Sequence, residues 1–199
     1  MTPSKSRLSA LTAEKILDVA EKLIQTRGYS AISYQDIADA IDMRKASIHY
    51  HYPSKADLGL AVIDRYAERF DTALRAIGDD TALSSVAALE RYLEPFIAYA
   101  KQTDQVCLCG ALAGEILVLP PAMRERVERF FAFHQTWLAK TLKRGADRGE
   151  FHLPGKPKQV ARLFFAALQG ALLVKRATGR ADQVFDVIAM LRRQLSSEA

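Results

Sequence analysis

The sequence is poor in cysteine: among its 199 residues there are only two, Cys107 and Cys109. Two thiols are too few for a disulfide scaffold, and no apolar run approaches the ~18 residues of a membrane span. Residues 1–12 carry cations but lack the apolar stretch of a secretory signal. The chain also contains no nucleophile motif, no phosphate-binding loop and no set of metal ligands. We therefore expect a cytoplasmic protein with reduced thiols, no membrane contact, no catalytic residues, no metal and no cofactor.

The charged and apolar contents of the chain set weaker limits on the class of protein and on its partners. Apolar residues make up 49% of the chain, enough to bury a core, and charged residues make up 26%, which indicates a soluble protein. The net charge of +5 permits an anionic partner, although cations scattered over the surface would give the same total. The length fits one large domain or two small ones.

Apolar residues recur at helical spacing through nearly the whole chain, and no segment shows the alternation typical of a strand. Thr12 can cap a first helix that Gly28 would end. Ser33, with Asp36 three residues later, forms an acidic variant of the capping box at the start of a second helix. A short third helix is expected at residues 43–51. Ser54 can cap a long fourth helix.

The remaining sequence continues the helical pattern beyond the polar segment 78–81. Pro95 should kink a fifth helix, because proline removes a hydrogen bond and clashes with the preceding turn. Later helices are expected at residues 107–119, 122–147, 158–177 and 181–196. The sequence therefore predicts an all-α fold of about nine helices.

The segment from Gln35 to Lys55 predicts a helix, a tight turn and a second short helix. In a helix-turn-helix unit, the second helix lies in the major groove with its N-terminal residues at the base edges. Side chains there can read bases, and tyrosine or lysine side chains near its end suit phosphates. A short helix hairpin with a solvated charged face would give the same spacing. The candidate DNA contacts are Ser33, Gln35, Arg44, Lys45, Ser47, His49, Tyr50 and Lys55.

Residues 12–63 resemble the N-terminal domain of the TetR family of bacterial transcriptional regulators. The resemblance rests on ILDVAEKLIQTRGYSAISYQDIADAI and KASIHYHYPSKADL, and on the family register of Gly28-Tyr29, Asp36-Ile37-Ala38 and Asp57-Leu58. It implies a three-helix DNA-binding domain over residues 1–56, and a ligand-binding and dimerisation domain over residues 57–199. It also implies a homodimeric repressor that a small-molecule effector releases from a pseudo-palindromic DNA operator. The alternative is an all-helical enzyme or carrier that binds a small molecule but not DNA.

Four positions depart from the family pattern: Asp42, Arg44, His49 and Tyr52. The family usually has Tyr at position 49 and Phe at position 52. The family often has Gly where Asp42 stands, and Ser or Thr where Arg44 stands. An arginine cannot cap a helix as a serine does, so we expect a recognition helix without a side-chain cap. Arg44 is then free to contact DNA.

The helix expected at residues 158–177 is apolar nearly all round, which indicates burial on both sides. This helix and the last one can form a two-fold, four-helix interface with a second copy of the chain. An intramolecular core is the alternative. The interface candidates are Phe164, Ala167, Leu168, Ala171, Phe185, Ile188 and Leu191.

Aromatic residues of the C-terminal part can line an effector pocket, although each of them could instead fill the core. The candidates are Tyr92, Phe96, Tyr99, Leu112, Phe130, His134, Trp137 and Phe165. Glu115 is expected either as an exposed charge or as a polar group in that pocket. The long fourth helix, which joins the DNA-binding domain to the pocket, is the expected lever between them.

The Cys-x-Cys pair, Cys107 and Cys109, is compatible with more than one role. Two residues apart on a helix, its side chains point about 200° apart, so a shared metal is disfavoured. A thiol at a helix start can have a lowered pKa, and the thiolate is the reactive form. The motif also resembles a branch of the family that responds to reactive electrophiles or short unsaturated acids. Cys107 is therefore the first candidate sensor and Cys109 the second, and two small buried apolar residues are the alternative.

Overall fold

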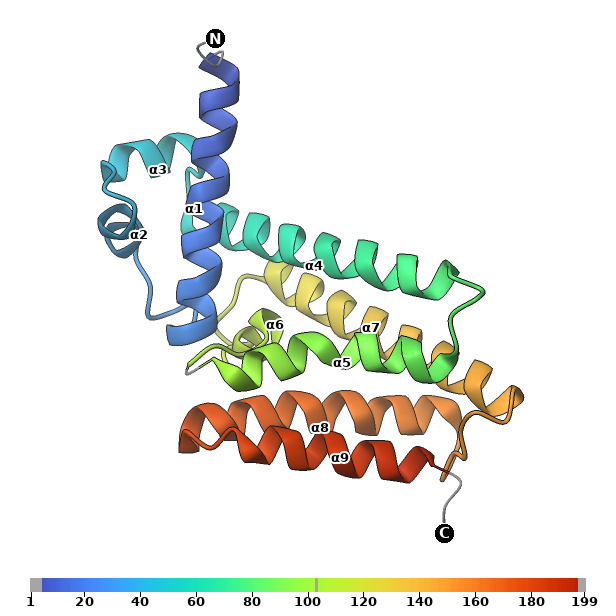
Figure 1. The fold of residues 1–199 in the computed structure, drawn as a ribbon. Helices are drawn as coiled ribbons and strands as arrows, with labels where there is room; N and C mark the ends of the chain where they lie inside the picture. Colours follow the sequence, from blue (N-terminus) through green and yellow to red (C-terminus); the bar gives the residue numbers. More distant parts are fainter. Residues whose placement is uncertain (1–4, 103, 197–199) are drawn as a thin grey trace.

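The computed structural model describes residues 5–102 and 104–196, which form nine α-helices and no strand. The predicted all-α fold is confirmed. Figure 1 shows the first three helices as a head at one end of a stack of longer helices, which we call the body. None of the helices in these ranges has both the length and the apolar content of a bilayer-spanning segment. The head contains α1 (Lys5–Arg27), α2 (Tyr34–Ala40) and α3 (Lys45–His51), and the body contains α4 (Lys55–Asp79), α5 (Ser85–Lys101), α6 (Leu108–Ala113), α7 (Pro121–Asp147), α8 (Pro157–Thr178) and α9 (Asp182–Leu195).

Two capping boxes start α2 and α4. The Ser33 hydroxyl accepts a hydrogen bond from the Asp36 N–H (3.3 Å), and the Asp36 carboxylate accepts one from the Ser33 N–H (2.7 Å). Ser54 and Asp57 repeat this arrangement at 3.1 and 3.0 Å. Because each box satisfies two donors that the helix start leaves unpaired, the predicted starts of both helices are confirmed.

Two predicted boundaries are wrong. α1 begins at Lys5 rather than after Thr12, and the Thr12 hydroxyl donates to the Leu8 carbonyl inside the helix (2.9 Å). A threonine can cap a helix or bond back to the preceding turn, so its presence does not mark a helix start. α6 ends at Ala113 rather than at residue 119, because the backbone from Gly114 onward forms tight turns.

Two turns of the head use the left-handed region of backbone space. Gly28 has a φ of 91° and follows the last residue of α1, as predicted. Asp42 has a φ of 52°, at the position where the family often has glycine, and aspartate is one of the few residues that tolerate this region. The Met43 N–H there donates to the Ala38 carbonyl at 2.9 Å. The chain enters α3 through Arg44, whose side chain makes no capping hydrogen bond.

The body is layered. α7 packs against α4 on one side and α8 on the other, and α9 packs against α8 (Figure 1). The Trp137 Nε1–H of α7 donates to the Leu74 carbonyl of α4 at 2.7 Å. At the start of α5, the Glu150 carboxylate accepts hydrogen bonds from the backbone N–H groups of Ser85 (2.5 Å) and Val86 (3.2 Å). One of these polar contacts joins α7 to α4 and the other fixes the start of α5, in addition to the apolar packing between the helices.

A cation lies buried at the other end of α5. Lys175 of α8 is only 2% exposed, and its ammonium donates to the carbonyls of Tyr99 (3.1 Å) and Gln102. Carbonyls at a helix C-terminus lack partners within the helix, and a cation there also complements the helix dipole. Burial lowers the pKa of Lys175. The ammonium thus joins the end of α5 to α8.

Replacing this ammonium should destabilise the fold. We expect Lys175→Met to lower the free energy of unfolding by about 1–3 kcal/mol, because buried carbonyls lose a charged donor. The exposed neighbour provides the control, since Arg176→Met should change stability by no more than about 0.5 kcal/mol. Urea unfolding followed by circular dichroism measures both changes. Equal stability of the two variants would contradict this role for Lys175.

Candidate DNA-binding surface and effector site

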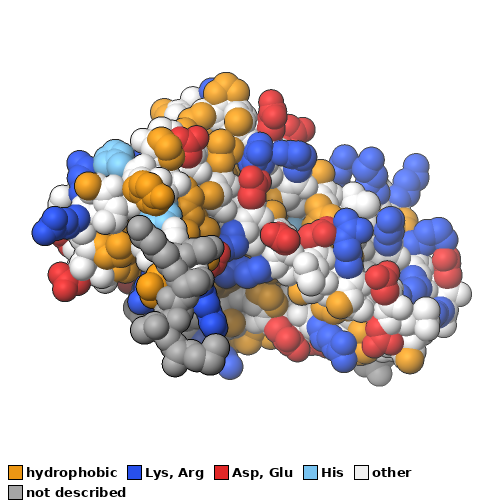
Figure 2. Space-filling model, turned by 90° about the horizontal axis from the view of Figure 1, so that it is seen from above, with side chains coloured by type: hydrophobic (Ala, Val, Ile, Leu, Met, Phe, Trp, Pro, Cys, Tyr) orange, Lys and Arg blue, Asp and Glu red, His pale blue; other side chains and the backbone are white. Residues whose placement is uncertain are grey.

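The outer face of α3 presents the residues predicted to read DNA. Arg44 and Lys45 are exposed at its start, and Ser47 is half-buried one turn further on. Tyr50 is 81% exposed, whereas Ile48 is fully buried and anchors the opposite face of the helix in the head. Seen from above, Lys, Arg and His side chains lie on the head at the left of the molecule (Figure 2). The helix therefore offers donors outward while its apolar face holds it in place.

The N-terminal part of α1 runs beside α3 and widens this surface. A hollow of about 820 Å³ lies between the two helices, lined by Ser9, Thr12, Met43, Arg44, Ala46, Ser47, Tyr50 and His51. Sequence reasoning missed the contribution of α1, because it placed the helix start after Thr12. The helical character of residues 5–11 was the signal that could have revealed it.

The other predicted DNA contacts already have partners within the head. The Ser33 hydroxyl caps α2, and the Gln35 side chain donates to Asp39 at 2.6 Å. The His49 ring lies 4.5 Å from the Tyr34 ring, measured between centroids. These side chains are exposed but are also part of the local structure of the head.

Lys55 lies where the head meets the body. Its ammonium is 4.6 Å from the centre of the Tyr29 ring and donates to the Ser30 carbonyl at 3.4 Å. Burial lowers the pKa of Lys55, and the nearby Glu115 carboxylate opposes that shift. Lys55 therefore contacts the turn between α1 and α2 from the first position of α4.

A string of polar groups crosses the interior from Cys107 to α1. The Tyr66 hydroxyl of α4 donates to the Cys107 sulfur at 3.6 Å and lies 3.1 Å from the Tyr99 hydroxyl of α5. The Gln25 amide nitrogen of α1 donates to the Tyr99 hydroxyl at 3.0 Å, and the Gln105 amide donates to the Gln25 oxygen at 3.3 Å. Because the Tyr66 hydroxyl uses its one hydrogen on the sulfur, the Tyr99 hydroxyl donates to Tyr66, and the sulfur is the final acceptor.

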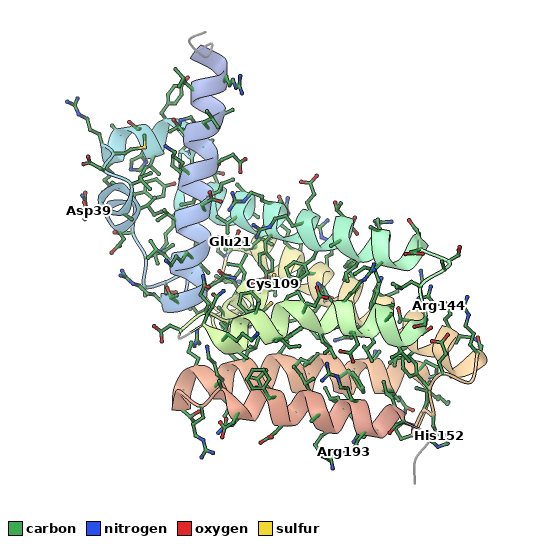
Figure 3. All side chains as sticks on the ribbon, viewed as in Figure 1. Glu21, Asp39, Cys109, Arg144, His152 and Arg193 are labelled. Carbon is green, nitrogen blue, oxygen red and sulfur yellow. The ribbon has the colours of Figure 1, made fainter. Side chains whose placement is uncertain are left out.

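The two cysteines have different surroundings. Cys107 precedes α6 and is 4% exposed, whereas Cys109 is fully buried. Burial raises the pKa of the Cys109 thiol well above its usual value, so this thiol stays protonated. Figure 3 labels Cys109 in the interior, near the base of α1. Across the part of the chain that the structure describes, no three His, Cys, Asp or Glu side chains gather to hold a metal ion.

The predicted aromatic residues form a cluster around His134. Its ring centroid lies 4.2 Å from that of Phe130 and 5.6 Å from that of Phe165, and its Nδ1 is 3.2 Å from the Tyr92 hydroxyl. Burial lowers the pKa of His134 to about 3, so the imidazole is neutral. Tyr92 in turn stacks on Trp137 at 5.3 Å.

His134 also carries an unused polar atom. Among the described residues, its buried Nε2 has no hydrogen-bond partner, and such a group in an apolar interior is costly. Of the other pocket candidates, Phe96 joins this cluster through the Tyr92 ring. Leu112 is fully buried on α6, and Tyr99 belongs to the string that ends at Cys107.

The predicted interface residues divide into two groups. Five are buried within the single chain: Phe164, Leu168, Ala171, Ile188 and Leu191. Ala167 is half-buried and Phe185 is 40% exposed. The large apolar side chains that α8 and α9 expose are instead Leu163, Val174, Phe185 and Met190. Because α8 is apolar nearly all round, its sequence did not reveal which face the chain itself covers.

Glu115 has neither of the two roles that its sequence context indicated. It lies in the turns after α6, where its Oε1 accepts from the Tyr29 N–H at 2.7 Å and its Oε2 accepts from the Ser30 N–H at 2.8 Å. The carboxylate of the body thus binds the backbone of the head. No local pattern signals this contact, because the partners are 85 and 86 positions apart in the chain.

Comparisons with known proteins agree with this architecture. Residues 16–62 match the family model of bacterial regulatory proteins of the tetR family, and residues 85–191 match that of the tetracyclin repressor-like C-terminal domain. The HTH-type transcriptional repressor DhaR of Mycobacterium sp. (strain GP1) is 25% identical over 194 residues, which cover 94% of this chain and 96% of DhaR.

Solved structures of full length are also similar. A TetR-family regulator from Agrobacterium tumefaciens superposes with a TM-score of 0.87 at 32% identity, covering 94% of this chain and all (100%) of that one. A TetR regulator from Legionella pneumophila gives 0.83 at 29% identity, covering 98% and 100%. Both parts of the chain and its whole fold therefore lead to one conclusion: it belongs to the TetR family, as a ligand-responsive, DNA-binding transcriptional regulator.

Proposed function

We propose that this regulator is a homodimeric repressor that leaves its operator when a small molecule acts on the body, and that Cys107 is the group through which a thiol-reactive effector does so. The observation that carries the proposal is the string of hydrogen bonds from the Cys107 sulfur to Gln25 of α1. It connects the candidate sensor to the longest helix of the head. The buried aromatic cluster around His134 is the second candidate site, for a non-covalent effector.

The chemistry of Cys107 supports a covalent effector. The thiol loses its proton, and the thiolate adds to the β-carbon of an activated alkene: the S–C bond forms, the C=C π bond breaks, and the α-carbon takes up a proton, which leaves a thioether. With iodoacetamide the S–C bond forms as the C–I bond breaks and iodide leaves. The sulfur is then a weaker acceptor for the Tyr66 hydroxyl, and the added group enters a space that is closely packed, since Cys107 is 4% exposed. Close-packed interiors do not absorb added volume without moving their elements. Modification of Cys107 therefore has a direct route to α4, α5 and α1.

The exposed apolar residues of α8 and α9 support the dimer. Leu163, Val174, Phe185 and Met190 are 40–51% exposed, and apolar side chains exposed on two neighbouring helices offer surface that a second copy can bury. Pairing these helices with their two-fold copies gives a four-helix interface. Two heads on one duplex then require half-sites about 34–36 Å apart, or a near multiple.

A charge in this face should dissociate the dimer. We expect Leu163→Glu to give a monomer at micromolar concentration, because the interface would bury an unpaired carboxylate. The fold should survive, since Leu163 is half exposed in the single chain. Leu11→Glu on the exposed side of α1 is the control and should remain dimeric. Multi-angle light scattering measures both, and a wild-type monomer or a dimeric Leu163→Glu would refute this interface.

Arg44 is the sharpest test of DNA reading. Arg44→Ala should reduce discrimination at one operator base pair by about 1–3 kcal/mol, because a bidentate arginine contact reads one guanine. Helix content should not change, since Arg44 makes no capping hydrogen bond. Competition gel-shifts with point-substituted operators measure the effect, using an operator selected from random duplexes with the purified chain. The control is Arg193→Ala, which removes the same charge at the far end of the body and should leave the base-pair preference unchanged. Unchanged specificity in Arg44→Ala would make Arg44 a phosphate or solvent residue.

Iodoacetamide tests the thiol. We expect it to weaken operator binding by wild type and by Cys109→Ser roughly 5- to 150-fold, the range of common allosteric couplings. Cys107→Ser should be unaffected, because a serine hydroxyl is not alkylated under the same conditions. Intact-mass measurement confirms which sulfur has reacted. Cysteine sensing would be rejected if wild type is not released, or if release persists when Cys107→Ser and Cys109→Ser are combined. A non-covalent effector at the cluster around His134 would then be the remaining candidate.

A further inference from the structure

The segment from Cys107 to Glu115 connects the candidate sensor to the head. It contains α6, which packs against α1 of the head as well as against α4, α7 and α8 of the body. The sulfur near its first turn accepts the hydrogen bond from Tyr66, and the carboxylate just beyond its last turn holds the head. The two ends of one short segment therefore carry the two functional contacts.

The contact at Glu115 is bidentate and closely fitted. Each carboxylate oxygen takes one backbone N–H, from Tyr29 at 2.7 Å and from Ser30 at 2.8 Å. Hydrogen bonds to an ionised carboxylate are about twice as strong as neutral ones. The carboxylate also approaches Gly28 so closely that a Cβ on Gly28 would lie 2.3 Å from the Glu115 Oε1. A glycine at this turn is thus required by both its positive φ and the neighbouring carboxylate.

The turn bound by Glu115 is the hinge between α1 and the helix-turn-helix. Its N–H groups face the body carboxylate, while its Ser30 carbonyl accepts from Lys55, the first residue of α4. The same ammonium lies over the Tyr29 ring. The turn is therefore held from both sides by residues outside the head, and its direction sets the direction of α2 and α3.

We propose that Glu115 is a positioning residue for DNA binding: its carboxylate fixes the angle of the head on the body, and the segment Cys107–Glu115 carries a change at Cys107 to that angle. The first half stands without the thiol chemistry, and the second half rests on the proposed function. This assigns to α6 and its following turns the transmission that sequence reasoning assigned to α4.

The positioning role of Glu115 is tested by spacing discrimination, which is the ratio of the affinities for two operators that differ in the distance between their half-sites. Heads held at a fixed angle should bind an operator with two base pairs inserted between its half-sites about tenfold or more weakly, because the insertion turns and separates the half-sites. Glu115→Gln keeps the shape of the side chain but offers one acceptor and turns its amide toward the second N–H. We expect this variant to bind both operators within about threefold of each other, since mobile heads adapt to either spacing.

Glu150→Gln is the matched control. Glu150 also accepts two backbone N–H groups with its carboxylate, but it does so at the start of α5, far from the head. It should lose comparable stability in urea while keeping the full discrimination of wild type. Any of three results would overturn the positioning role. Glu115→Gln could discriminate between the two spacings as well as wild type does, Glu150→Gln could lose as much discrimination as Glu115→Gln, or wild type itself could show no discrimination.

Iodoacetamide then tests transmission. We expect alkylation to lower the spacing discrimination of wild type to the level of Glu115→Gln, and to change Glu115→Gln little further. Equal release of wild type and Glu115→Gln from the operator would overturn transmission through this segment. If wild type stays bound after iodoacetamide treatment, both the thiol proposal and the proposed transmission fail. The binding of untreated protein to the two operators still decides the positioning role of Glu115.

Discussion

The place of the head depends on α1, because this helix packs against helices of both the head and the body. The apolar residues of head and body form one continuous cluster. α1 contributes Ile16, Ala20 and Ile24 to it, all buried, and packs against α4 and α6 as well as against α2 and α3. The head cannot turn without moving α1 relative to those two body helices. An event near α6 therefore reaches DNA reading through packing that the fold requires in any case.

Polar contacts decide where on α1 that movement is resisted. Arg65 of α4 binds Glu14, Asp18 and Glu21, but the Glu14 and Asp18 side chains are 61% and 66% exposed, and exposed pairs contribute only about 0–1 kcal/mol. Glu21, labelled in Figure 3, is the better protected partner at 12%. At the other end of α1, bonds from charged groups to backbone, such as those of Glu115, contribute about 1.5–3 kcal/mol each. Polar contacts thus join α1 to the body both at Glu21 and at the turn that follows the helix.

The parts of this structure that sequence reasoning could predict are local ones. Ser33 and Asp36 are three positions apart, and spacing alone defines their capping box. The helix start predicted from Thr12 was wrong, because a threonine can either cap a helix or bond back to the preceding turn inside one. Glu115 could not be placed at all, since its partners are remote in sequence and are backbone groups without residue identity. The residues predicted for the interface are mostly ones that the single chain buries, because an all-round apolar helix has no periodic signal to orient it.

The burial of Cys107 has a consequence in time as well as in space. With 4% of its surface exposed, the sulfur meets a reagent only while the surrounding helices are transiently open. An opening free energy of about 2.8 kcal/mol would slow alkylation about a hundredfold relative to a free thiol. A brief pulse of a dilute electrophile would then pass with few molecules modified, whereas sustained exposure would modify most of them. If Cys107 is the sensor, as proposed, its close packing would make the response depend on how long the electrophile is present as well as on its concentration.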